Sequence, residues 1–258
     1  MFTMLNVGDS HMGKTRALST LKGNTIIFNF EPPDNVSSLI VPCVEVPRLK
    51  GCTANGAGIL VVQYGLIAPS FEADARIRPS KDKAQAFIED VQWFESHQEG
   101  VSNLVVETLE PFSYAYLEFI AASGGARKAD AEIQLQDYNV LVRKVTGAIG
   151  KLMSFGKNVI LTAHLDTEKD EITHRTKTLP MSIGRKLGPL MPKLFSEIFC
   201  SETQMAGSTL KYMWNTKPEP NGFLTFLGSR KDKMGKLPKF IDPDYGYLEK
   251  FLKEVEKK

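Results

Sequence analysis

Apolar residues occur along this chain in short, nearly continuous runs, which is the pattern of strands buried on both faces of a sheet. The four clearest runs are 2–7, 25–30, 104–106 and 159–163. Further strand candidates are 39–46, 59–63, 195–200, 210–215 and 223–228. We therefore expect a sheet that crosses the interior of the protein.

Between these runs, apolar residues recur every three or four positions with charges between them, as in an amphipathic helix. This spacing is clearest over 82–97, where Phe87, Val91 and Phe94 share one face. Other helices are expected at 13–21, around 112–120, at 140–153 and at about 243–258. The long polar stretch of about 165–193 is expected to be a mobile loop, because loops of this length are usually functional or disordered.

Strands that alternate with helices predict an α/β fold, with a mostly parallel central sheet covered by helices on both faces. The ligand crevice of such a sheet lies at the carboxyl ends of its strands. The 258 residues are enough for a single domain that spans the whole chain.

Composition excludes several other classes of protein. Hydrophobic residues make up 42% and charged residues 24% of the chain, and no apolar run approaches the ~18 residues of a membrane span. No secretion signal is expected, and the odd set Cys43, Cys52 and Cys200 suits reduced thiols in a cytoplasm. The net charge of +2 means that nucleic-acid binding would need a local basic surface.

One motif carries specific chemistry. Its eight residues match G-x-x-x-x-G-K-[ST] in full: Gly8, Asp9, Ser10, His11, Met12, Gly13, Lys14 and Thr15. In a P-loop, the glycines let backbone N–H groups curl around phosphate oxygens, the lysine reaches the β- and γ-phosphates, and the hydroxyl binds Mg²⁺. A strand precedes the motif and a helix follows it, so ATP with Mg²⁺ is the expected ligand, with Arg16 included in its site. The dinucleotide pattern G-x-G-x-x-G is not matched, which argues against NAD.

Acidic and polar residues end the neighbouring strands. Glu107 follows 104–106 in the position of a Walker B acid, and Glu31 follows 25–30, where it could orient or deprotonate a water. His164 ends a fourth strand and could hydrogen-bond to a γ-phosphate. The alternatives are that the glutamates are solvated strand ends and that the histidine is satisfied locally.

A basic run, 229–233, follows the last strand candidate. Arg230 and Lys231 could act on the γ-phosphate of a neighbouring subunit, as an arginine finger does. The alternative is an ordinary solvated charged surface.

These residues resemble a family: RecA-like, AAA-domain ATP-binding proteins of the short phage-encoded recombinase or single-strand annealing type, which consist of little more than the ATPase core. The resemblance rests on the P-loop and on 26–31, 104–107, 161–164 and 228–231, and spans about residues 2–250.

The resemblance implies that Lys14 and Glu31 are catalytic, that Thr15 and Glu107 hold the metal, and that His164 senses the γ-phosphate. It also implies that Arg230 or Lys231 acts in trans in a homo-oligomeric ring or filament. Single-stranded DNA is the implied partner, a single-strand-binding protein is a candidate partner, and the location is the bacterial host cytoplasm. The Walker B acid of such proteins is normally aspartate, so Glu107 implies slow hydrolysis or a differently held metal.

The loop after His164 would then face DNA. The stretch 172–193 contains no acid and carries the cations Arg175, Lys177, Arg185, Lys186 and Lys193. Such a segment suits phosphate contacts whose strength falls with salt. Four acids lie just before it, and few aromatic residues are available to stack on bases.

Three functions compete at this point. The first is a DNA-dependent ATPase of recombination or annealing. The second is a small-molecule or nucleotide kinase, which would need an arginine-rich lid and an acceptor pocket. The third is a nucleotide-gated binding module with little turnover, which the glutamate at position 107 makes worth testing.

Overall fold

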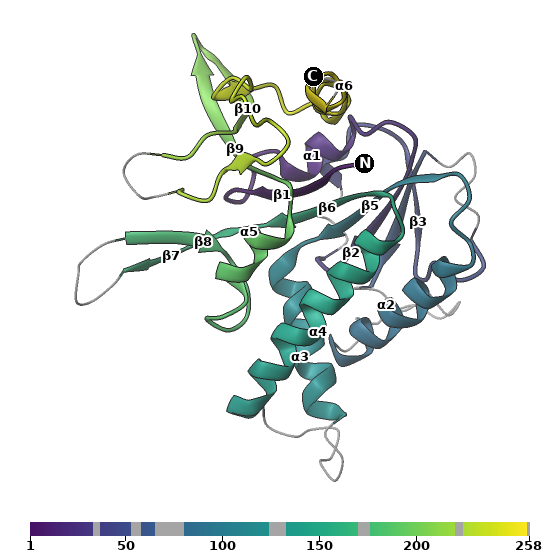
Figure 1. The fold of residues 1–258 in the computed structure, drawn as a ribbon. Coiled ribbons are helices and arrows are strands. Elements are labelled where there is room, and N and C mark those ends of the chain that lie inside the picture. The colour runs from purple at the N-terminus through teal and green to yellow at the C-terminus, as the bar shows by residue number, and fades with distance from the viewer. Residues whose placement is uncertain are drawn as a thin grey trace.

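The computed structural model describes residues 1–32, 37–52, 58–64, 80–123, 133–169, 176–219 and 224–256. Within these residues, ten strands form one sheet (Figure 1). They are β1 (Thr3–Val7), β2 (Asn24–Asn29), β3 (Cys43–Val46), β4 (Ile59–Gln63), β5 (Val101–Glu107), β6 (Asn158–Ala163), β9 (Glu197–Ala206), β10 (Thr209–Asn215), β11 (Gly228–Ser229) and β12 (Phe240–Ile241).

The strand order is β12-β10-β9-β1-β6-β5-β2-β4-β3, and β11 pairs with β9. All neighbours from β9 to β3 are parallel, whereas β10, β11 and β12 pair antiparallel at one side. Strand β6 therefore lies between β1 and β5. This order brings the carboxyl ends of β1, β6, β5 and β2 together at one edge of the sheet.

Helices cover both faces of the sheet (Figure 1). One face carries α2 (Ser80–Glu95), α3 (Leu109–Ala122) and α4 (Leu135–Ser154), and the other carries α1 (Lys14–Leu18) and α6 (Tyr245–Glu256). The expected fold class, an α/β RecA-like P-loop core with a mostly parallel sheet, is confirmed.

Alternation along β2 shows how the sequence produces the two layers. Ile27 packs toward α1 and α6, whereas Phe28 and the following Phe30 pack on Phe87 of α2. Phe30 also meets Phe112 of α3, with ring centroids 4.9 Å apart. Each fully buried side chain of this size stabilises the fold by roughly 1.5–3 kcal/mol, so the strand that leads to Glu31 is firmly held.

Several expected boundaries were wrong. Helix α1 ends at Leu18 instead of continuing to 21, because Ser19 and Thr20 form a turn whose hydroxyl and amides bond back to the helix. The strand expected over 39–46 is confined to Cys43–Val46. The strand expected over 223–228 begins outside the described residues, and among 224–228 only Gly228 pairs with β9, since 224–226 form a turn.

The expected mobile loop at about 165–193 was also wrong where the structure describes it. Strands β7 (Leu165–Lys169) and β8 (Thr176–Pro180) form an antiparallel hairpin, followed by a 3-10 turn, η2 (Gly188–Leu190), and a short helix, α5 (Met191–Leu194). Threonines at 167, 176 and 178 suit the pleated ladder of a hairpin. The turn of the hairpin, including Arg175, lies outside the described residues.

Candidate functional site

The phosphate-loop motif connects β1 to α1 at the edge where the four strand ends meet. Its glycines have left-handed backbone angles, with φ of 151° at Gly8 and 80° at Gly13. A Cβ atom at Gly8 would lie 2.6 Å from the carbonyl oxygen of Ser201, and one at Gly13 would lie 2.7 Å from the ring of Tyr212. Both positions therefore require glycine, for conformation and for space.

Lys14 is the centre of the loop. Its Nζ donates hydrogen bonds to the carbonyl oxygens of Gly8, at 2.7 Å, and Asp9, at 2.8 Å. The same atom lies 3.3 Å from Nδ1 of His164. Burial lowers the pKa of Lys14, and the carboxylates of Glu107 and Glu31 oppose that shift. The ammonium group is thus held in place where the four strand ends meet.

Thr15 and Glu107 form a second polar contact. The Thr15 hydroxyl donates to Oε1 of Glu107 at 2.6 Å. Glu107 is 2% exposed, and its Oε2 has no hydrogen-bond partner among the residues that the structure describes. Burial raises the pKa of Glu107 to about 7; the Thr15 hydrogen bond opposes this shift, and the Glu31 carboxylate adds to it.

This pair fits a divalent cation. A hydroxyl and a carboxylate are hard oxygen ligands of the kind that Mg²⁺ prefers, and a cation would satisfy the buried Oε2. In the described part of the chain, no cluster of three or more His, Cys, Asp or Glu residues could hold a metal. Phosphate oxygens and water would therefore supply the remaining ligands, as is usual for Mg²⁺ beside a nucleotide.

Glu31 and His164 complete the same edge. The Thr108 hydroxyl donates to Oε1 of Glu31, and Nε2 of His164 lies 3.5 Å from that oxygen. A neutral His164 that accepts from Lys14 at Nδ1 and carries its proton on Nε2 satisfies both neighbours. The histidine thereby connects the phosphate-loop lysine to the strand-end glutamate.

A pocket of about 540 Å³ holds this constellation. Its walls include Ser10, His11, Gly13, Lys14, Thr15, Arg16, Glu31, Glu107, His164 and Tyr212. Of the other motif residues, Gly8 and Asp9 contribute carbonyls to Lys14, and Met12 turns its sulfur toward the Thr203 hydroxyl at 3.5 Å. The structure thus brings together the predicted loop, both glutamates and the histidine.

Sequence reasoning missed Thr108 and Tyr212. Thr108 directly follows Glu107, so its place at the strand end could have been noticed. Tyr212 lies in β10, about 200 residues from the loop, and the Arg16 guanidinium stands 5.6 Å from its ring centroid. No local sequence pattern predicts this contact, because it arises from the antiparallel pairing of β10 with β9.

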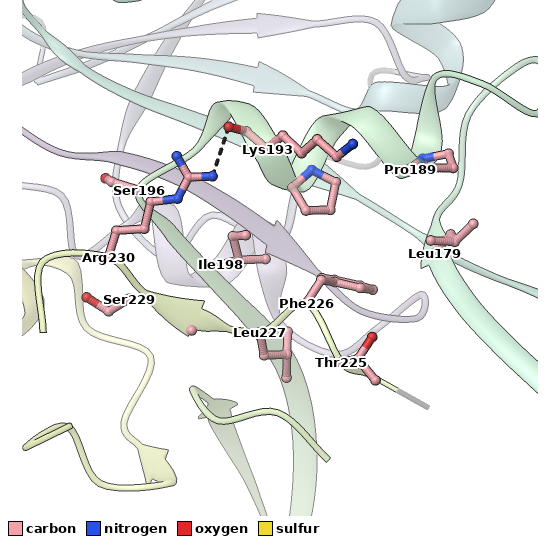
Figure 2. Close-up of a pocket in the computed structure, with 12 residues that line it drawn as sticks. Leu179, Pro189, Lys193, Ser196, Ile198, Thr225, Phe226, Leu227, Ser229 and Arg230 are labelled. Atoms are coloured by element: carbon pink, nitrogen blue, oxygen red, sulfur yellow. Dashed lines mark hydrogen bonds between the residues drawn. The ribbon is translucent and has the colours of Figure 1, made fainter. Parts of the chain in front are cut away.

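Arg230 and Lys231 lie at the opposite end of the sheet. Strand β11, just before them, pairs with Glu197 and Ile198 at the start of β9. Arg230 donates to the carbonyl of Lys193 at 2.9 Å, as Figure 2 shows, and Lys231 donates to the carbonyl of Met1 at 2.6 Å. Met1 and the phosphate loop are separated by the length of β1, roughly 20 Å, so these cations do not join the pocket of their own chain.

The cations predicted to meet DNA are partly described. Arg185 and Lys186 are exposed in the turn after β8, and Lys193 is exposed at the end of α5. Lys186 contacts the Asn139 side chain of α4 at 3.0 Å. Lys177 lies in β8, although its side chain, like Arg175, is outside the described part.

The strand order, the loop and the converging acids define a P-loop ATPase core of the RecA-like type. Residues 2–223 match the sequence model of a family described as AAA domain. The match covers most of the chain, and the protein belongs to that family. No curated protein sequence matches the chain.

Two of the solved structures that resemble this chain illustrate its low sequence identity to them. A prototypical ATPase from the type III secretion system of pathogenic bacteria has 12% identity and a TM-score of 0.42, over 77% of this chain and 51% of that chain. The KaiC-like protein PH0186 from Pyrococcus horikoshii OT3 has 11% identity and a TM-score of 0.40, over 83% and 77%. The chain thus spans about half the length of the secretion ATPase. Among the described residues, no helix is long and apolar enough to cross a membrane.

The raised pKa of Glu107 predicts how stability depends on pH without metal. The carboxyl group of Glu107 binds its proton more tightly in the folded protein than in the unfolded chain. Protonated Glu107 therefore contributes its full stability to the fold below pH 4.5, and this contribution is lost as pH rises through about 7. Glu107→Gln should therefore increase the free energy of unfolding at pH 8, by on the order of 1–3 kcal/mol, and so raise the melting temperature. At pH 4.5 it should change both quantities little. Thermal unfolding in a chelating buffer measures this, with the exposed Glu99→Gln as control. A stability difference that is the same at both pH values would contradict the assignment.

Proposed function

We propose that the protein is a Mg²⁺-dependent, DNA-stimulated ATPase that acts in recombination or single-strand annealing of the phage type. It works as a homo-oligomer, and its chain forms a single ATPase domain. The observation that carries the proposal is the convergence of Lys14, Thr15, Glu107, His164 and Glu31 on one pocket.

Each residue has a role that follows from its position. Backbone N–H groups of the loop and the Lys14 ammonium bind the β- and γ-phosphates. Thr15 and Glu107 would hold Mg²⁺, which neutralises charge that develops on the phosphate oxygens.

The other two residues act at the γ-phosphate. Glu31 orients the attacking water and accepts its proton, because its carboxylate lines the pocket and lies 3.5 Å from Nε2 of His164. His164 donates from Nε2 toward the γ-phosphate or Glu31 and so responds to the presence of that phosphate.

Two other functions make different demands on the pocket. A kinase would need several arginines around the acceptor. Among the described residues, Arg16 is the one arginine that lines the pocket. A binding module with little turnover is favoured by one specific feature: Glu107, longer than aspartate by a methylene, reaches the Thr15 hydroxyl directly. That contact competes with the metal for both ligands.

Two substitutions separate binding from hydrolysis. Lys14→Ala should abolish ATP binding, because the buried ammonium is the main charge that meets the phosphates. Glu31→Gln should retain binding and lower turnover by roughly 10²–10⁴-fold, the usual contribution of a general base. Calorimetry with ATP and measurement of released phosphate, with and without single-stranded DNA, test both, with Glu99→Gln as control.

The same assay separates the alternatives. Phosphate transferred to a small acceptor instead of water would identify a kinase. Tight binding with no phosphate release by the wild-type protein would identify a binding module. Turnover by Glu31→Gln equal to that of the wild type would remove Glu31 from the mechanism.

The proposal of DNA binding is supported by the segment that follows His164. The amide of Met181 donates to the carbonyl of His164 at 2.7 Å, so the segment that carries Arg185 and Lys186 begins on the histidine of the nucleotide site. Farther along, Lys193 and Arg230 border a pocket of about 430 Å³ that also exposes the ring of Phe226 (Figure 2). Cations beside an aromatic ring are what single-stranded nucleic acid requires.

Charge reversal tests the DNA surface. Arg185→Glu with Lys186→Glu should weaken binding of single-stranded DNA and flatten the dependence of affinity on salt, by about 0.7 in the logarithmic slope for each DNA phosphate that is no longer neutralised. Fluorescence anisotropy of a labelled oligonucleotide at several salt concentrations measures both. Lys250→Glu with Lys253→Glu, on exposed positions of α6, is the matched control. An equal fall in affinity in both double variants would indicate a nonspecific charge effect and contradict a DNA site at 185–186.

A further inference from the structure

The two sides of the phosphate loop differ in chemistry. Strand β1 has β6 as its neighbour on one side and β9 on the other. His164, Glu107 and Glu31 follow β6, β5 and β2, which all lie on the β6 side. Since the metal and the attacking water act at the γ-phosphate, that end of a triphosphate must face β6.

The remainder of the nucleotide can then extend to the other side, toward β9 and β10. Tyr212 of β10 lies there. Its ring packs directly over Gly13, where a Cβ atom would come within 2.7 Å, and it lines the same pocket as Lys14. The guanidinium carbon of Arg16 lies over this ring, 5.6 Å from its centroid.

The ring is held rather than loosely placed. Tyr212 pairs with Thr203 in the β9–β10 ladder, and the Thr203 hydroxyl reaches the sulfur of Met12 in the phosphate loop at 3.5 Å. The ring is partly exposed to the pocket. A flat, partly exposed aromatic face anchored beside a phosphate site is suited to stack on a planar group.

We propose that Tyr212, positioned beside Arg16, is the platform on which the base of the bound nucleotide stacks. This inference rests on the proposed binding of a nucleoside triphosphate and specifies which residue supplies affinity for the nucleoside. Stacking accepts any base, because every base has a π-face. Tyr212 therefore strengthens binding of ATP and GTP alike, and discrimination between them must come from other groups.

A purely structural role for Tyr212 is the main alternative, since the ring also supports Gly13. The two roles differ in their effect on a ligand that has phosphates but no base. Loss of stacking leaves tripolyphosphate binding unchanged, whereas a disturbed phosphate loop weakens it together with ATP. A second alternative places the base on the opposite wall of the pocket, where Ile40 is 61% exposed.

The test is calorimetric titration with ATP, GTP and tripolyphosphate, each with Mg²⁺, for the wild type and for Tyr212→Phe, Tyr212→Ala and Ile40→Ala. Tyr212→Phe should bind as the wild type does. Tyr212→Ala should lose roughly 5- to 150-fold in affinity for ATP and for GTP, as expected for one base–aromatic stack, and keep its affinity for tripolyphosphate. Equal melting temperatures confirm that the variants are folded.

Three outcomes would overturn the inference. ATP affinity unchanged in Tyr212→Ala removes the platform, and a matching decrease for tripolyphosphate makes the ring structural. A decrease for ATP in Ile40→Ala alone moves the base to the other wall. Failure of the wild type to bind any of the three ligands would instead overturn the proposed nucleotide site itself, so the two failures are distinguishable.

Discussion

The position of one buried ammonium group governs the rest of the site. Removing Lys14 from water is costly, and its lowered pKa expresses that cost. Two loop carbonyls, an imidazole nitrogen and the nearby carboxylates offset it. Because these partners come from β1, β6, β5 and β2, the charge is stable only where the four strand ends meet. The phosphate loop, the order of the strands and the residues at the strand ends therefore depend on one another.

Strand order decides which side chains share this edge. Strand β6 lies between β1 and β5, so His164, which follows β6, lies between Lys14 and Glu31 and contacts both. Packing of the two helical layers keeps these strands rigid. The proposed water-activating residue, Glu31, and the proposed metal ligand, Glu107, are placed by the neighbouring strands β2 and β5. The same geometry assigns the nucleoside to the β9 side.

Local signals explain what the sequence could predict. The motif at 8–15 is contiguous in sequence. Glu31, Glu107 and His164 could be placed at strand ends because each of them directly follows an apolar run. The hairpin formed by β7 and β8 was missed because its strands contain few apolar residues and several charges. Tyr212 and the location of Arg230 depend on antiparallel pairing along β9, which no short-range pattern determines.

Close backbone approach ties the phosphate loop to one end of a long ribbon. Gly8 touches Ser201 of β9, and Gly13 touches Tyr212 of β10, near the base of a hairpin that runs on to Met205 and Leu210. Those two apolar side chains are exposed at its far end. The phosphate loop and the exposed apolar tip of this hairpin therefore share one hydrogen-bonded ladder.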